Sequence, residues 1–125
     1  MADYYGLTSL GIVSALGSDA AEVTERALAG DMSFMRPLSG VLPGGETTPF
    51  GMCDVESDAY PSRVAALLAA AAKGIAPEIE ELKSVYGAAK IGVVIGTSNS
   101  TMEEFTADPV RIDMATPAMF LRDHL

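Results

Sequence analysis

The chain of 125 residues contains few cysteine, histidine and basic residues. Its one cysteine, Cys53, allows no disulfide within the chain, which is typical of proteins of the reducing cytoplasm. Its one histidine, His124, has no second ligand that would make a metal site. Only 8 Lys and Arg accompany 17 Asp and Glu, and the net charge of −9 repels nucleic-acid phosphates and anionic membrane surfaces. We therefore expect no metal, no nucleic-acid partner and no membrane partner.

Long apolar runs are also absent. The longest, Val64–Ala72, is far shorter than the roughly 20 residues that span a bilayer. The first ten residues lack a basic region followed by an apolar run, so no signal peptide is expected. Hydrophobic residues make up 49% of the chain, which excludes intrinsic disorder. The sequence predicts a cytoplasmic protein in which residues 1–125 form a single folded segment.

Start and stop signals predict four helices. Asp19 and Glu22 form a capping box for a helix that ends at Gly30. Ser62 is placed to cap a second helix, and Pro77 to start a third in its first turn. A last helix is expected from Thr116 through His124, and one turn at 102–105. The apolar face of the second helix is predicted to consist of Val64, Leu67, Leu68, Ala71 and Ile75.

Two stretches are predicted to be strands. Residues 4–16 contain Gly6 and Gly11, which indicate close packing of the backbone against a neighbour. Lys90–Gly96 is apolar on both faces, as central parallel strands are. Asp31–Gly51, with three prolines and four glycines, is expected to be irregular. A short edge strand is expected over 50–55.

This order of elements favours an α/β fold with a parallel sheet flanked by helices. Apart from the short edge strand, two strands are few for four helices, so part of the sheet is expected to come from elsewhere. The apolar side chains patterned for further layers include Leu67, Leu68, Val93 and Ile95. Because exposing such side chains costs about 1.5–3 kcal/mol each, we expect self-association or a partner.

The second predicted strand ends in a loop of small hydroxyl residues, Thr97 to Thr101. Its sequence is not the nucleophile elbow G-x-S-x-G, because Ser100 stands where the last glycine belongs. It contains neither phosphate-loop pattern, G-x-x-x-x-G-K-[ST] or G-x-G-x-x-G. A polar turn whose hydroxyls cap backbone N–H groups is favoured. Cys53, beside Asp54 in an apolar stretch, is expected to be an inert thiol.

Five stretches, taken in order, resemble the N-terminal portion of β-ketoacyl-[acyl carrier protein] synthases. The first is the turn "GIVSALG", Gly11 to Gly17, and the second is the helix end "LAG", residues 28–30. They are followed by the helix "RVAALLAAAA", the strand and loop "KIGVVIGTSNS" and the helix "TPAMFLRDHL". The resemblance covers nearly the whole chain.

The resemblance implies that the chain is the incomplete N-terminal part of a thiolase-like layered α/β fold. It implies decarboxylative Claisen condensation of acyl carrier protein thioesters, with no cofactor, in fatty-acid or polyketide synthesis. The family uses a cysteine nucleophile at a helix N-terminus and two histidines. Cys53 precedes the hydroxyl-rich loop whereas the family's cysteine follows it, and His124 lies in the helix before the nucleophile. No catalytic residue is therefore assigned.

The same resemblance places the substrate-binding loop of the acyl pocket at Thr97, Ser98 and Asn99, with a loop that merely packs as the alternative. It implies acyl carrier protein as a partner, through the full-length enzyme, and a homo- or hetero-oligomer. Three interpretations stay open: an N-terminal portion that is inactive by itself, a non-catalytic subunit of the chain-length-factor type that pairs with an active synthase, and an independent α/β domain whose likeness is coincidental.

Overall fold

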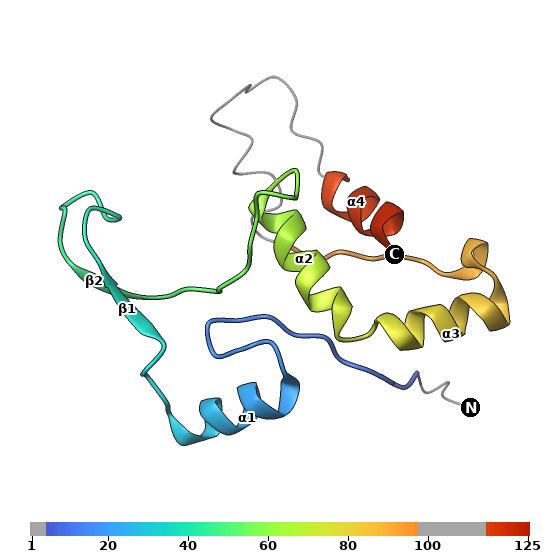
Figure 1. Ribbon diagram of the computed structural model, residues 1–125, viewed down its shortest axis with the longest axis horizontal. Coiled ribbons are helices and arrows are strands. Elements are labelled where there is room, and N and C mark those ends of the chain that lie inside the picture. The colour runs from blue at the N-terminus through green and yellow to red at the C-terminus, as the bar shows by residue number, and fades with distance from the viewer. Residues whose placement is uncertain (1–4, 98–114) are drawn as a thin grey trace.

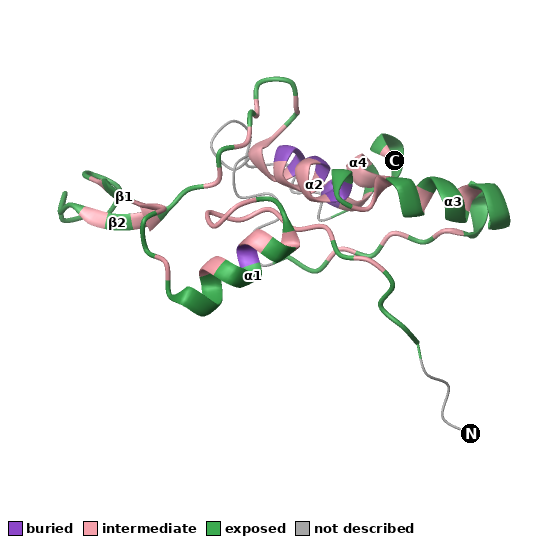
Figure 2. Cartoon of the chain, turned by 60° about the horizontal axis from the view of Figure 1, so that its bottom comes forward, coloured by how far each residue is buried: buried purple, intermediate pink, exposed green. Residues whose placement is uncertain are grey.

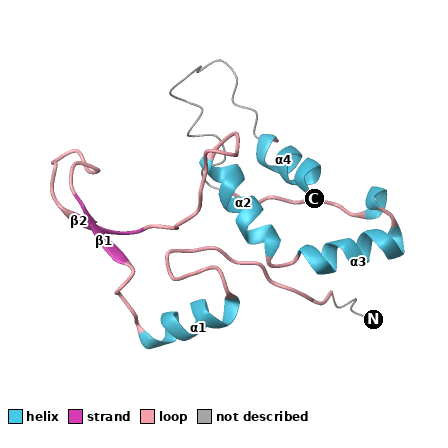
Figure 3. Ribbon diagram, viewed as in Figure 1, coloured by secondary structure: helices cyan, strands magenta, loops and turns pink. Residues whose placement is uncertain are grey.

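The computed structural model describes residues 5–97 and 115–125, which form helices and one two-stranded antiparallel sheet (Figures 1 and 3). The predicted mixture of α and β structure is confirmed. The predicted parallel sheet is not found among the described residues, where the one sheet is antiparallel. The predicted turn at 102–105 lies outside them. In chain order the elements are α1 (Ala20–Ala29), β1 (Met35–Leu38), β2 (Thr48–Gly51), α2 (Arg63–Lys73), α3 (Ala76–Tyr86), the 3-10 turn η1 (Ala88–Lys90) and α4 (Thr116–His124).

Helix α1 begins and ends at the predicted residues. The Asp19 carboxylate accepts hydrogen bonds from the backbone N–H groups of Ala21 and Glu22, both at 3.0 Å. At the other end Gly30 adopts φ 64°, the left-handed conformation that glycine reaches most easily. The second half of the capping box differs, because the Glu22 carboxylate pairs with Arg26 at 2.8 Å.

Helices α2, α3 and α4 also start where their signals predict. The Ser62 hydroxyl accepts a hydrogen bond from the N–H of Ala65 at 3.1 Å and so caps α2. Pro77 lies in the first turn of α3, and Pro117 in that of α4. None of the described helices has the length and apolar character that crossing a membrane requires.

The buried face of α2 is not the predicted one. Its predicted apolar residues are only half-buried, and four alanines are buried instead, as the purple segments of Figure 2 show: Ala65, Ala66, Ala69 and Ala72. Their small side chains let neighbouring backbone approach, and α4 packs against α2 (Figure 1). The small size of these side chains therefore decides the buried face of α2, and the larger apolar side chains stay half-buried.

The extended segment before α1 lies across the end of α2. A Cβ on Gly11 would lie 2.0 Å from the carbonyl oxygen of Ala71, and one on Gly74 would lie 3.1 Å from the Gly11 Cα. The close packing predicted at Gly11 is confirmed, whereas a Cβ on Gly6 would meet nothing within 4 Å, so the prediction is wrong there. Residues 5–16 form no strand, apart from a single bridge between Ser14 and Gly17.

Residues 31–51 are not irregular as predicted, because β1 and β2 form a hairpin within them that projects away from the helices (Figure 1). Pro37 pairs with Pro49 across the ladder. Proline has no backbone N–H to donate, so the pair fits a position where the backbone nitrogens of both strands point away from the partner strand. No hydrogen bond between β1 and β2 is lost there, and each outer edge of the hairpin has one donor fewer. The edge strand predicted over 50–55 exists only at Phe50 and Gly51, the end of β2.

The hairpin is joined to α1 through Asp31. The Asp31 carboxylate accepts a hydrogen bond from the backbone N–H of Ser33 at 2.8 Å. Hydrogen bonds from the side chain and the backbone of Ser33 hold the pKa of Asp31 below its ordinary value. The ionised carboxylate is therefore part of this turn.

The prediction of a strand at Lys90–Gly96 is wrong for the described residues. The chain leaves η1 in an extended conformation, with Ile91 at φ −100° and ψ 121°, but no neighbouring strand pairs with it. Val94 is 94% exposed, whereas Val93 and Ile95 are half-buried. Apolar patterning and an extended backbone are present, and a partner strand is what is missing.

The core is small. The buried residues of the described chain are Val23, Pro117 and the four alanines of α2, and none of the large side chains is fully buried. The accessible surface is 9370 Å², against about 6300 Å² for a compact protein of this mass. Much apolar surface is left without a neighbour.

Candidate functional site

The described chain contains a cleft of about 840 Å³. It lies between the turn of residues 13–18, the segment 52–60 and one face of α2, with Arg26 of α1 at its side. Its volume falls within the range of small-molecule pockets. Its lining combines backbone, small apolar residues and four charged side chains, Arg26, Asp54, Glu56 and Lys73.

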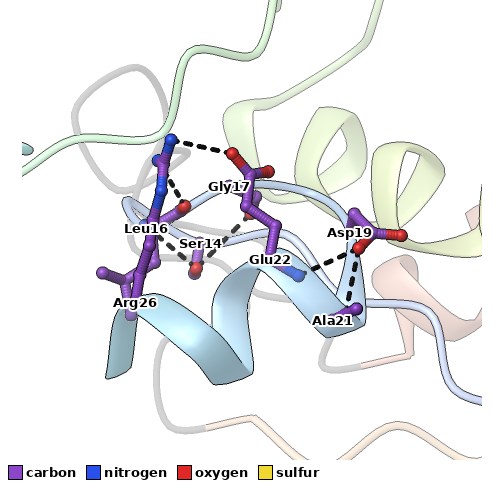
Figure 4. A network of polar contacts seen from close by, with 7 residues as sticks. All are labelled: Ser14, Leu16, Gly17, Asp19, Ala21, Glu22 and Arg26. Carbon is purple, nitrogen blue, oxygen red and sulfur yellow. Dashed lines mark hydrogen bonds and ion pairs between the residues drawn. The ribbon is translucent and has the colours of Figure 1, made fainter. Parts of the chain in front are cut away.

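The turn of residues 13–18 is closed by its own hydrogen bonds. Ser14 and Gly17 exchange backbone hydrogen bonds of 2.9 and 3.2 Å. The Ser14 hydroxyl accepts from the N–H of Leu16 at 3.1 Å and donates to the Gly17 carbonyl at 3.4 Å (Figure 4). Gly17 has φ 141°, and a Cβ there would lie 2.5 Å from a Glu22 carboxylate oxygen. Ser14 therefore helps to hold the turn together.

Arg26 ties this turn to α1. Its Nη1 donates to the carbonyl oxygen of Leu16 at 2.8 Å, and its Nη2 lies 2.8 Å from Glu22 Oε1 (Figure 4). Both charged side chains are more than two-fifths exposed, so the ion pair contributes little by itself. Its role is geometric, because one guanidinium bridges a helix turn and the wall of the cleft.

The opposite wall is held by two other arginines. Arg63, in the first turn of α2, donates to the carbonyl oxygens of Cys53 and Val55. Arg36 of β1 pairs with Asp54 at 2.7 Å. Together these contacts tie the segment 52–60 to both α2 and the hairpin.

A second cavity of about 150 Å³ lies where the end of α4 meets α2 and α3. Beside it, His124 stacks on Phe120 with ring centroids 5.3 Å apart, and Tyr60 meets the edges of both rings at 6.1 Å. Lys83 of α3 donates to the carbonyl oxygen of Leu125. These contacts fasten α4 to the body, and they give His124 a packing role.

The residues predicted for the acyl-pocket loop fall at the edge of the described chain. Thr97 is exposed at the end of the extended segment and lines neither cavity. Ser98 and Asn99 lie outside the described residues. The acyl-pocket loop thus stays a prediction.

The described residues that line the cleft include neither a cysteine nor a histidine, and Cys53 is a half-buried thiol in the loop before α2. Within residues 5–97 and 115–125 no cluster of three potential metal ligands occurs. The cleft has the character of a binding surface of mixed charge.

Sequence reasoning did not find the cleft. The spacing of Glu22 and Arg26, four residues apart on a helix, is a local signal that points to their ion pair. The contact of Arg36 with Asp54 depends on the hairpin and has no such signal. Comparison with known proteins gave no match, whether with family models, curated proteins or solved structures.

Proposed function

We propose that residues 1–125 form the N-terminal portion of a β-ketoacyl-[acyl carrier protein] synthase and are inactive by themselves. The observation that carries the proposal is the order of five stretches along the chain, from the turn at Gly11 to the helix at Thr116.

Local geometry supports this proposal at four of the five stretches. The helix "RVAALLAAAA" lies within α2. The "GIVSALG" stretch forms a closed turn whose first glycine packs on α2. Helix α1 ends at Gly30 in the left-handed conformation. Helix α4 spans the stretch that begins at Thr116.

The uncovered apolar surface supports the proposal at a larger scale. The extended segments 5–13 and 91–96 and the outer face of α3 expose large apolar side chains, among them Leu7, Val85 and Val94. A layered α/β enzyme would cover such surfaces with further strands and helices of its own. We infer that they are inner surfaces of the larger fold.

The chemistry proposed for the whole enzyme is a decarboxylative Claisen condensation. A cysteine thiolate carries the acyl group as a thioester, malonyl thioester loses CO₂, and the resulting enolate forms a C–C bond to the acyl carbon and releases the thiolate. Oxyanion donors stabilise the charge on the thioester oxygen. The part assigned to this chain is the acyl-pocket wall at Thr97, Ser98 and Asn99.

The test begins with the 125-residue chain and acyl and malonyl thioesters of acyl carrier protein. No 3-oxoacyl product is expected. The reading frame after the codon of Leu125 should encode a cysteine at the start of a helix, and the longer protein should carry out the condensation. Replacing that cysteine with alanine should abolish turnover, and the matched control Cys53→Ala should retain it. Condensation by the short chain, or inactivity of Cys53→Ala in a folded longer protein, would contradict the proposal.

A second candidate is a non-catalytic subunit that pairs with an active synthase. It is favoured by the half-buried Cys53 lying in a loop and not in a helix, together with the uncovered apolar surface. Co-expression with an active synthase should then yield a stable stoichiometric complex. A chain that elutes apart from the synthase argues against this candidate.

A further inference from the structure

The backbone of the extended segment 91–96 is largely unpaired in the described chain. The N–H of Ile91 bonds to the carbonyl of Ala88 at 3.1 Å, but in the described chain no backbone hydrogen bond involves residues 92–96. Val94 is 94% exposed. Unpaired backbone groups beside exposed β-branched side chains form a template to which another strand can add.

The sequence of this segment is suited to pairing with itself. "IGVVIG" has no charge and no proline, and four of its six residues are β-branched. The sequence of residues 91–95 is nearly palindromic about Val93. In an antiparallel pair centred on Val93, Ile91 of one copy lies opposite Ile95 of the other, and the contact has two-fold symmetry.

The charge distribution also selects this segment. Residues 82–102 form the longest stretch without an acidic residue, and they include two lysines. Two copies that each carry a net charge of −9 repel one another least where neither presents a carboxylate. In the antiparallel register Lys90 lies opposite Gly96, so no like charges face each other across the pair.

The chain exposes more surface than a compact protein of its mass does. The accessible surface exceeds that of a compact protein of this mass by about 3000 Å², and a standard interface takes about 800 Å² from each partner. The pairing strands would supply the centre of the interface.

We propose that the 125-residue chain by itself forms a two-fold dimer through antiparallel pairing of residues 91–96. The inference goes beyond the proposed function, in which further strands of the same enzyme cover this segment. When residues 1–125 are present without the rest of the enzyme, a second copy takes the place of those strands. Its test uses that chain alone, so its outcome is independent of the condensation assay.

The first experiment is sedimentation equilibrium of the wild-type chain and two matched variants. Val94→Lys and Leu28→Lys make the same chemical change at sites that are 94% and 85% exposed. The wild type and Leu28→Lys should be dimers. Val94→Lys places two ammonium groups diagonally across the pair on one face, and its dimer should be weakened about tenfold or more. A monomeric wild type, species larger than a dimer, or equal effects of the two variants would overturn the proposal.

The second experiment tests the register. In a Cys53→Ala background, Val93→Cys places two thiols opposite each other at the two-fold axis, within reach of a disulfide. Oxidation should give a covalent dimer with Val93→Cys and not with Leu28→Cys, since Leu28 lies on α1, outside the segment. Equal cross-linking of both variants would rule out this pairing.

Discussion

At the scale of single residues, Gly11 has the closest packing among the glycines of the described chain. A methyl group there would lie 2.0 Å from the backbone oxygen of Ala71, which cannot move without distorting α2. We expect Gly11→Ala to lower the free energy of unfolding by about 1–3 kcal/mol. Urea denaturation followed by the circular dichroism of the helices measures it.

Gly6→Ala is the matched control, because the same methyl group at Gly6 meets no atom within 4 Å. It should leave the urea midpoint unchanged. Equal midpoints for the two variants would mean that residues 10–12 do not pack on α2 in solution.

At the scale of elements, the helices were predictable and the strands were not. A helix is fixed by nearby residues, and the caps at Asp19 and Ser62 act within one turn of the chain. A strand needs a neighbour, and residues 90–96 have the pattern of a strand without a described neighbour. The hairpin was not predicted because prolines usually interrupt strands. In the observed register Pro37 lies opposite Pro49, at a position where no hydrogen bond between the strands is lost.

The same distinction applies to the candidate site. The Glu22–Arg26 pair follows from helix spacing alone, whereas the cleft needs the turn at 13–18, the segment 52–60 and α2 to come together. Pattern reasoning also took large side chains for the buried face of α2. The structure instead buries alanines, because α4 and residues 10–11 approach too closely for larger groups.

The Asp19 cap allows a prediction about one element. Asp19→Ala removes the acceptor for two backbone N–H groups and should destabilise α1 by about 1 kcal/mol, whereas Asp19→Asn should keep most of the cap. Hydrogen exchange of the α1 amides measures the effect. Glu25→Ala, an exposed position on the same helix, removes one negative charge without removing a cap, and it should leave exchange near the wild-type rate. If Glu25→Ala accelerates exchange as much as Asp19→Ala does, charge and not capping stabilises the helix start.

At the scale of the whole molecule, charge and apolar surface act against each other. The uncovered apolar segments favour association, while a net charge of −9 on every copy opposes it. Salt screens the repulsion, since the Debye length falls from about 14 Å at 0.05 M to about 4 Å at 0.5 M, and leaves the uncharged pairing segment unaffected. We therefore expect the dimer to become tighter as sodium chloride is raised over this range, as measured by sedimentation equilibrium.

A variant with less charge separates screening from other effects of salt. Glu25→Gln, Glu46→Gln and Asp58→Asn together remove three negative charges at exposed positions outside the ion pairs of the described chain. This variant should dimerise more tightly than the wild type at low salt and respond less to added salt, because it has less repulsion to screen. A dimer that weakens as salt rises would mean that ion pairs hold the two copies together, and the acid-free segment would then not be the centre of the interface.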